Sequence, residues 1–119
     1  MARRPDGALE SDVLSVLWRT GQPMTPAEVR AGLGSDLAYT TVMTVLGRLC
    51  DKGVLRRQPR GRAFAYQPEV SESQLTARRM GEALAGARDR ERALSGFVGG
   101  LSKRDAELLR RAIAELDGR

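Results

Sequence analysis

The side chains with the most evident binding chemistry lie between residues 37 and 53. At a helical period, one face of this stretch presents hydroxyl, methyl and guanidinium groups, which can contact base edges in a DNA groove. These groups belong to Thr40, Thr41, Thr44 and Arg48. An arginine can bind guanine through two hydrogen bonds or can bind a phosphate, so the sequence leaves the role of Arg48 open.

The opposite face of the same stretch is apolar, which predicts an amphipathic helix from Tyr39 to about Lys52, ended by Gly53. The apolar positions, spaced i, i+3, i+4 and i+7, are Val42, Val45, Leu46 and Leu49. Tyr39 lies at the helix start, where its hydroxyl and the free backbone N–H groups suit a phosphate. The alternative interpretation is an ordinary packed helix whose polar face meets only water.

Gly47 lies on the polar face of this predicted helix. A glycine inside a helix costs about 1 kcal/mol relative to alanine. Close approach of DNA and close packing against another helix both account for such a cost, and the sequence does not separate them.

The positive charge of the chain is concentrated near the end of this helix. The net charge is +5, and the window from Arg48 to Arg62 holds six basic residues and one acid, which accounts for the whole excess. Such clustering is typical of a nucleic-acid-binding surface, although a solvated arginine-rich loop has the same pattern. We expect Arg60 to lie at the tip of a β-hairpin, the wing of a winged helix, and to reach the minor groove from there. The side chains expected to contact the DNA backbone are Lys52, Arg56, Arg57, Arg60 and Arg62.

The residues needed for catalysis or metal binding do not form a recognisable pattern. The sequence has no histidine and one cysteine, and it lacks metal-ligand spacing and a glycine-rich phosphate loop. We therefore expect no enzyme activity, no metal site and no cofactor. Cys50 is expected to behave as a small buried hydrophobe, and a redox switch promoted by Lys52 or Arg48 is the alternative.

Two shorter helices are expected before the threonine-bearing helix. The first follows a loose basic arm at residues 1–7 and runs from about Leu9 to Thr20, where Gly21 ends it and Trp18 packs. The second begins at a capping box formed by Thr25 and Glu28, and Gly32 and Gly34 close it. The second of these helices and the threonine-bearing helix are joined by a short turn that contains glycine, and together they match a helix-turn-helix.

After Gly53 the residue pattern changes to that of strands. We expect one strand over residues 54–58, a turn over residues 59–61 and a return strand over residues 62–67, with Phe64 and Tyr66 on one face. Three helices followed by a basic hairpin predict a winged helix-turn-helix over residues 1–70. The fold class is therefore mainly α with a small β-hairpin.

The remaining residues, 71–119, predict three helices that begin near Ser71, Asp89 and Ser102. Each has a thin apolar stripe, and that of the middle helix is expected to bury Ala93, Leu94, Phe97 and Val98. Such stripes make little core alone, so we expect an α-helical dimerisation domain, and folding back on the winged helix as a monomer is the alternative. The residues expected at the dimer interface are Leu84, Leu94, Phe97, Val98, Leu101, Leu109, Ile113 and Leu116.

Composition bears on where such a protein works. No apolar run approaches the roughly 20 residues needed to span a bilayer, and the residues after Met1 show no secretory pattern. One cysteine forms no internal disulfide, which fits a reducing compartment. We expect a cytoplasmic protein that does not contact a membrane.

Several runs of residues resemble the penicillinase-repressor family of BlaI, MecI and CopY. The most specific is Tyr-Thr-Thr-Val-x-Thr-x-Leu-x-Arg-Leu at residues 39–49, and further resemblance lies at residues 16–18, 25–29, 52–57, 61–66 and 101–102. The resemblance implies a dimeric repressor of antibiotic-resistance or metal-response genes. Its winged helix would bind inverted-repeat operators, and its C-terminal helices would interlock between subunits.

Two departures from the family pattern leave the inducing signal open. Where the β-lactam-responsive members resemble one another at an Asn-Phe bond cut by a protease, this chain has Gly96-Phe97, so we do not expect that cleavage. The C-terminal cysteine cluster of the copper-responsive members has no counterpart here, so we do not expect metal sensing by that means. The rival interpretations are a ligand-sensing, MarR-like regulator of drug-response genes and a winged helix used only for protein contacts.

Overall fold

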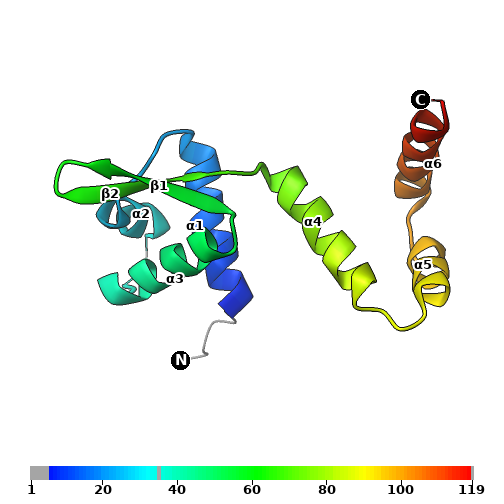
Figure 1. Cartoon of the computed structure of the whole chain (residues 1–119), viewed down its shortest axis with the longest axis horizontal. Helices are drawn as coiled ribbons and strands as arrows, with labels where there is room; N and C mark the ends of the chain where they lie inside the picture. The colour runs from blue at the N-terminus through cyan, green and yellow to red at the C-terminus, as the bar shows by residue number, and fades with distance from the viewer. Residues whose placement is uncertain (1–5, 35, 119) are drawn as a thin grey trace. The chain divides into compact units, whose positions relative to one another are not determined.

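The computed structural model describes residues 6–34 and 36–118. It is mainly helical with one two-stranded antiparallel sheet, so the predicted fold class is confirmed (Figure 1). The described residues divide into two compact units, one through Thr76 and one from Ala77 onward. The elements, in order, are α1 (Asp6–Thr20), α2 (Pro26–Leu33), α3 (Tyr39–Asp51), β1 (Leu55–Arg60), β2 (Ala63–Pro68), α4 (Glu72–Ala85), α5 (Arg90–Gly99) and α6 (Lys103–Asp117).

In the first unit, α1, α2 and α3 lie against the hairpin (Figure 1). These elements share one hydrophobic core, most of whose side chains are aliphatic. The apolar stripe predicted for α3 is fully buried, with every member at most 4% exposed. Tyr66, on β2, is the largest buried side chain, and its backbone pairs with Met24 through bonds of 2.7 and 2.9 Å. Burial of one stripe from each helix determines which side of α3 stays in water.

Helix α1 begins earlier than the sequence predicted. Asp6 and Gly7 belong to it, whereas the rest of the predicted basic arm, residues 1–5, lies outside the described residues. Its C-terminal end is as predicted, with the Gly21 N–H bonded to the Leu17 carbonyl at 3.2 Å. Trp18 packs against the core, and its indole N–H also donates to the Val70 carbonyl at 3.0 Å. This bond ties the end of α1 to the segment before α4.

The predicted capping box of α2 is confirmed. The Glu28 backbone N–H donates to the Thr25 hydroxyl at 3.3 Å, and the Thr25 N–H donates to the Glu28 carboxylate at 2.9 Å. Gly34, in a left-handed conformation, ends the helix. Gly32 does not end it, contrary to the prediction, because it lies inside the helix where a Cβ would meet Val16 Cγ1 at 2.8 Å. The glycine there allows α2 to lie close to α1.

The hairpin turn is shorter than predicted. Pro59 and Arg60 belong to β1, opposite Phe64 and Ala63, so placing them in the turn was wrong. A sheet with two strands has only edge strands, which tolerate a proline. The turn consists of Gly61 and Arg62, and Gly61 has a φ of 63°, a value that suits glycine in tight hairpin turns. The tip of the wing is therefore at residues 61–62.

The second unit contains α5, α6 and α4 from Ala77 onward. Reciprocal bonds between Ser71 and Gln74 cap α4, and Asp89 and Ser102 cap the next two helices, as predicted. The expected burial of Ala93, Leu94, Phe97 and Val98 is wrong for the single chain, because all four are exposed. No described residue of α5 or α6 is buried. None of the helices in the described part of the chain has the length and hydropathy that a membrane span requires.

Candidate nucleic-acid interface

Helix α3 places its polar side chains on the surface of the first unit. Thr40, Thr44 and Arg48 are exposed, and Thr41 is half-buried at the edge of the same face. Tyr39, at the first position, is 44% exposed. The N-cap residue Ala38 forms no side-chain hydrogen bond to the helix. The first backbone N–H groups of α3 can therefore donate to an external acceptor such as a phosphate. The structure thus brings the five α3 residues predicted for DNA contact to one side of the helix.

The hydroxyl of Thr44 is already used within the helix. It donates to the Thr40 carbonyl at 2.9 Å. A hydroxyl has only one hydrogen, so in this conformation it can offer a base only its lone pairs, beside the methyl group. Those groups suit an amino group or a thymine methyl in the major groove.

Lys52 is held by the fold rather than left free at the surface. Its ammonium lies 2.9 Å from Oε1 and 3.1 Å from Oε2 of Glu10, and the Glu10 side chain is only 10% exposed. The pair joins α1 to the C-terminal end of α3. A buried carboxylate requires a partner, so this contact opposes the predicted binding of Lys52 to a DNA phosphate.

Replacement of Lys52 by methionine should reduce the free energy of unfolding by about 1–3 kcal/mol, because the Glu10 carboxylate loses the ammonium that neutralises it. Urea unfolding followed by Trp18 fluorescence measures this change. The double variant Lys52→Met with Glu10→Gln should recover much of the loss, since an amide is cheaper to bury than a carboxylate. If the Lys52→Met variant and the double variant had the same free energy of unfolding, the ion pair of Lys52 with Glu10 would contribute little to stability.

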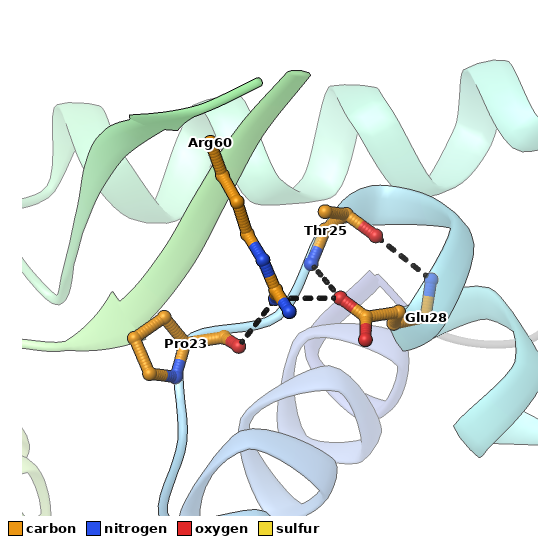
Figure 2. Close-up of polar contacts among 4 residues, drawn as sticks. All are labelled: Pro23, Thr25, Glu28 and Arg60. Atoms are coloured by element: carbon orange, nitrogen blue, oxygen red, sulfur yellow. Dashed lines mark hydrogen bonds and ion pairs between the residues drawn. The ribbon is translucent and has the colours of Figure 1, made fainter. Parts of the chain in front are cut away.

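Arg60 does not lie at the wing tip, contrary to the prediction, but leans from the end of β1 toward the start of α2. Figure 2 shows its guanidinium between the Pro23 carbonyl, at 3.3 Å, and the Glu28 carboxylate, at 3.0 Å. The same carboxylate oxygen accepts the Thr25 N–H, so one oxygen joins the capping box to the wing. The two bonds of Arg60 hold the wing against the helix-turn-helix.

The pKa of Glu28 is lowered, first by its backbone hydrogen bond with Thr25, then by the Thr25 side chain, with a smaller contribution from Arg60. A lowered pKa in the folded state means that the ionised carboxylate stabilises the fold above its unfolded pKa. That contribution is lost as the pH falls through the folded value. The junction between wing and α2 is therefore intact at neutral pH.

The other wing arginines differ in their partners. Arg56 pairs loosely with Glu69 at 3.6 Å, and both side chains are largely exposed. The Arg57 guanidinium lies over the Phe64 ring, 4.3 Å from its centroid, which orients the cation without neutralising it. Arg62 lies at the exposed turn. Among the described residues, no carboxylate forms an ion pair with Arg48, Arg57 or Arg62.

Two candidate residues were missed by sequence reasoning. Arg30, on α2, lines a surface hollow of about 380 Å³ together with Tyr39 and Asp36. It lies outside the basic window, so a search for consecutive charges does not find it. Met43 is 38% exposed on α3, and a count of helical positions from the buried stripe would have placed it on the polar side.

Cys50 is half-buried and packs against the core of the first unit. Burial raises the pKa of its thiol, with a smaller opposing effect from Arg57. A thiol with a raised pKa is a poor nucleophile at neutral pH. This environment favours the packing role over a redox switch.

The residues predicted for dimerisation leave much apolar surface in the single chain. Leu94, Phe97, Val98, Ile113 and Leu116 are 45–67% exposed, whereas Leu84, Leu101 and Leu109 are half-buried. Helices α4 and α5 frame an apolar groove of about 450 Å³ that is lined by Met80, Leu84, Leu94 and Phe97, among others. Exposed apolar surface of this kind marks an interaction site.

Comparison with known proteins identifies relatives over nearly the whole chain. A family model described as penicillinase repressor matches residues 7–115. A protein named transcriptional regulator BlaI from Mycobacterium tuberculosis is 42% identical over 116 residues, which cover 93% of this chain and 84% of that protein.

Two solved structures of BlaI proteins match part of this chain. The solution structure of the DNA-binding domain of the repressor BlaI is 34% identical with a TM-score of 0.50, and the match covers 56% of this chain and 82% of that one. A solution structure of monomeric Bacillus licheniformis BlaI in complex with the blaP half-operator is 31% identical, with a TM-score of 0.47. That match covers 61% of this chain and 87% of the other.

Proposed function

The chain belongs to the penicillinase repressor family, and we propose from this that it is a homodimeric repressor that binds an inverted-repeat operator. The family is one of transcriptional repressors rather than of enzymes. The observation that carries the proposal is the exposed face of α3. Its threonines and Arg48 lie on a fold that resembles the DNA-binding domain of BlaI. In winged and simple helix-turn-helix proteins, the second helix of the motif enters the major groove.

Base reading belongs, in this proposal, to Thr40, Thr41 and Thr44, with Arg48 on a guanine or an adjacent phosphate. Tyr39, Arg57 and Arg62 bind the backbone. Arg30 joins them because it lines the same hollow as Tyr39. Lys52 and Arg60 chiefly support α3 and the wing, since each is bonded to a carboxylate of the chain, and Arg56 holds a weaker pair with Glu69.

Thr44→Ala and Arg62→Ala separate the two roles. Thr44→Ala should weaken binding to the preferred duplex about tenfold, the loss typical of one mismatched base pair, and leave binding to unrelated duplexes unchanged. Arg62→Ala should weaken binding to both duplexes by the same factor, because a phosphate contact carries no sequence information. Fluorescence anisotropy measures the four dissociation constants, one for each variant with each duplex. The reverse pattern would mean that the two roles are exchanged.

Dimerisation is supported by the exposed apolar residues of α5 and α6, which a second copy can cover. A two-fold dimer presents two α3 helices to two half-sites, and this symmetry explains why such operators are inverted repeats. The family membership favours this function over a ligand-sensing regulator of another winged-helix family. We propose genes of β-lactam resistance or stress response as the targets.

Selection from a random pool of DNA duplexes tests the proposal directly. The wild-type protein should enrich an inverted repeat whose half-site centres lie about one helical turn, or a multiple of it, apart. Immunoprecipitation of the protein with its bound chromosomal DNA should then recover the same sequence upstream of target genes. Enrichment of no sequence, or of a single half-site without symmetry, would exclude the proposed function.

A further inference from the structure

We propose that Gly47 is a specificity-determining residue. Because it has no side chain, it leaves a gap at the centre of the exposed face of α3, and this gap receives the edge of an operator base pair. The inference rests on the proposed function of DNA binding. It concerns a residue without a side chain that could form a hydrogen bond or carry a charge, so it is distinct from the threonines and arginines assigned above. Its support comes from the packing of the folded chain.

The fold itself does not need a glycine at this position. Gly47 lies in the interior of α3, where glycine lowers helix stability relative to alanine. Its φ is not positive, because the positive-φ glycines among the described residues are Gly21, Gly34, Gly53 and Gly61. A Cβ built on Gly47 meets no atom of the described chain within 4 Å, apart from its own helix and neighbours.

Gly32 shows what a glycine required for packing looks like in the same unit. A Cβ at Gly32 would meet Val16 Cγ1 at 2.8 Å, so close contact between α1 and α2 accounts for it. Gly47 has no such contact with the described residues of the first unit, which removes close helix packing within that unit as its explanation. The remaining explanation raised by the sequence is the close approach of another molecule.

The surroundings of Gly47 indicate which part of DNA approaches. At the helical period its neighbours on α3 are Met43, Thr44, Cys50 and Asp51. Cys50 is half-buried, and the other three are exposed. Asp51 would repel a phosphate placed at the gap, whereas its carboxylate can accept a bond from a base amino group. Met43 and the methyl of Thr44 offer apolar contact. The gap therefore suits a base-pair edge in the major groove rather than the sugar-phosphate backbone.

Gly47→Ala tests the inference by changing stability and binding in opposite directions. The thermal midpoint should rise by about 2–8 °C, because an alanine stabilises the helix and meets nothing. Affinity for the duplex selected by the wild type should fall about tenfold or more, as for a mismatched base pair. Binding to unrelated duplexes, and its dependence on salt, should stay unchanged. A parallel selection with the variant should alter the preference at one base-pair position in each half-site.

Gly7→Ala is the matched control, because it adds the same methyl to α1 in a place where a Cβ also meets nothing. It should leave the affinity for the selected duplex unchanged. The inference is wrong if Gly47→Ala binds the selected duplex as tightly as the wild type, lowers the thermal midpoint, or weakens all duplexes equally. Failure of the wild type to select any sequence would instead defeat the proposed function, so the two failures are distinguishable.

Discussion

Ile113→Asp is expected to convert the proposed dimer to a monomer and to weaken operator binding by about 10²–10⁴-fold, the range by which the affinity of two linked binding sites exceeds that of one. Ile113 is 51% exposed in the single chain and lies on the apolar face of α6 with Leu109 and Leu116. A carboxylate on this face would be buried without a partner in the dimer, which strongly opposes association. The monomer keeps the contacts that one subunit makes with one half-site, but it loses the gain in affinity that comes from linkage to a second subunit.

Ala114→Asp is the control for this experiment. Ala114 is the next residue of α6 and, at the helical period, points away from the apolar face. The same charge is therefore added at the same level of the helix, and the protein should remain dimeric. Light scattering measures the mass of both variants. Trp18, the single tryptophan, lies in the first unit and reports whether the DNA-binding fold is intact. A dimeric Ile113→Asp variant would contradict the assignment of this helix to the interface.

Raising the salt concentration from 50 to 200 mM is expected to lower operator affinity about 10³-fold, the loss found for roughly six neutralised phosphates. Each subunit of the proposed dimer offers the three arginines assigned to the DNA backbone, Arg30, Arg57 and Arg62, and none of them forms an ion pair with a carboxylate of the described chain. Two subunits then release counterions from about six phosphates, and each contributes about −0.9 to the slope of log K against log salt. Titration at several salt concentrations measures this slope.

Two variants sharpen the salt experiment. Arg62→Ala should make the slope less negative by about 0.9 for each subunit, because one phosphate contact is lost. Lys52→Met should leave the slope unchanged, because Lys52 is bonded to Glu10. A slope change in Lys52→Met equal to that of Arg62→Ala would show that Lys52 leaves Glu10 to bind a phosphate. A flat salt response in the wild type would overturn the electrostatic interpretation as a whole.

Helix positions and caps were predictable because local interactions determine them. The capping box of Thr25 and Glu28 involves residues three apart, and the α3 stripe follows from helical geometry alone. The hairpin was predictable in its place but not in its register, since Pro59 suggested a turn where the strands still pair. Pairing across the hairpin tolerates a proline at an edge, and only the tight turn at Gly61 ends it.

The fold class, the position of helix α3 and the location of the net charge could be predicted from the sequence. Each depends on composition or on residues near one another in the chain. Which basic residues are paired with carboxylates depends on the tertiary fold. Lys52 meets Glu10 across 42 positions and Arg60 meets Glu28 across 32, while Arg30 comes beside Tyr39 through the packing of α2 on α3. An ion pair depends on distance in space, and for residues far apart in sequence the folded core determines that distance.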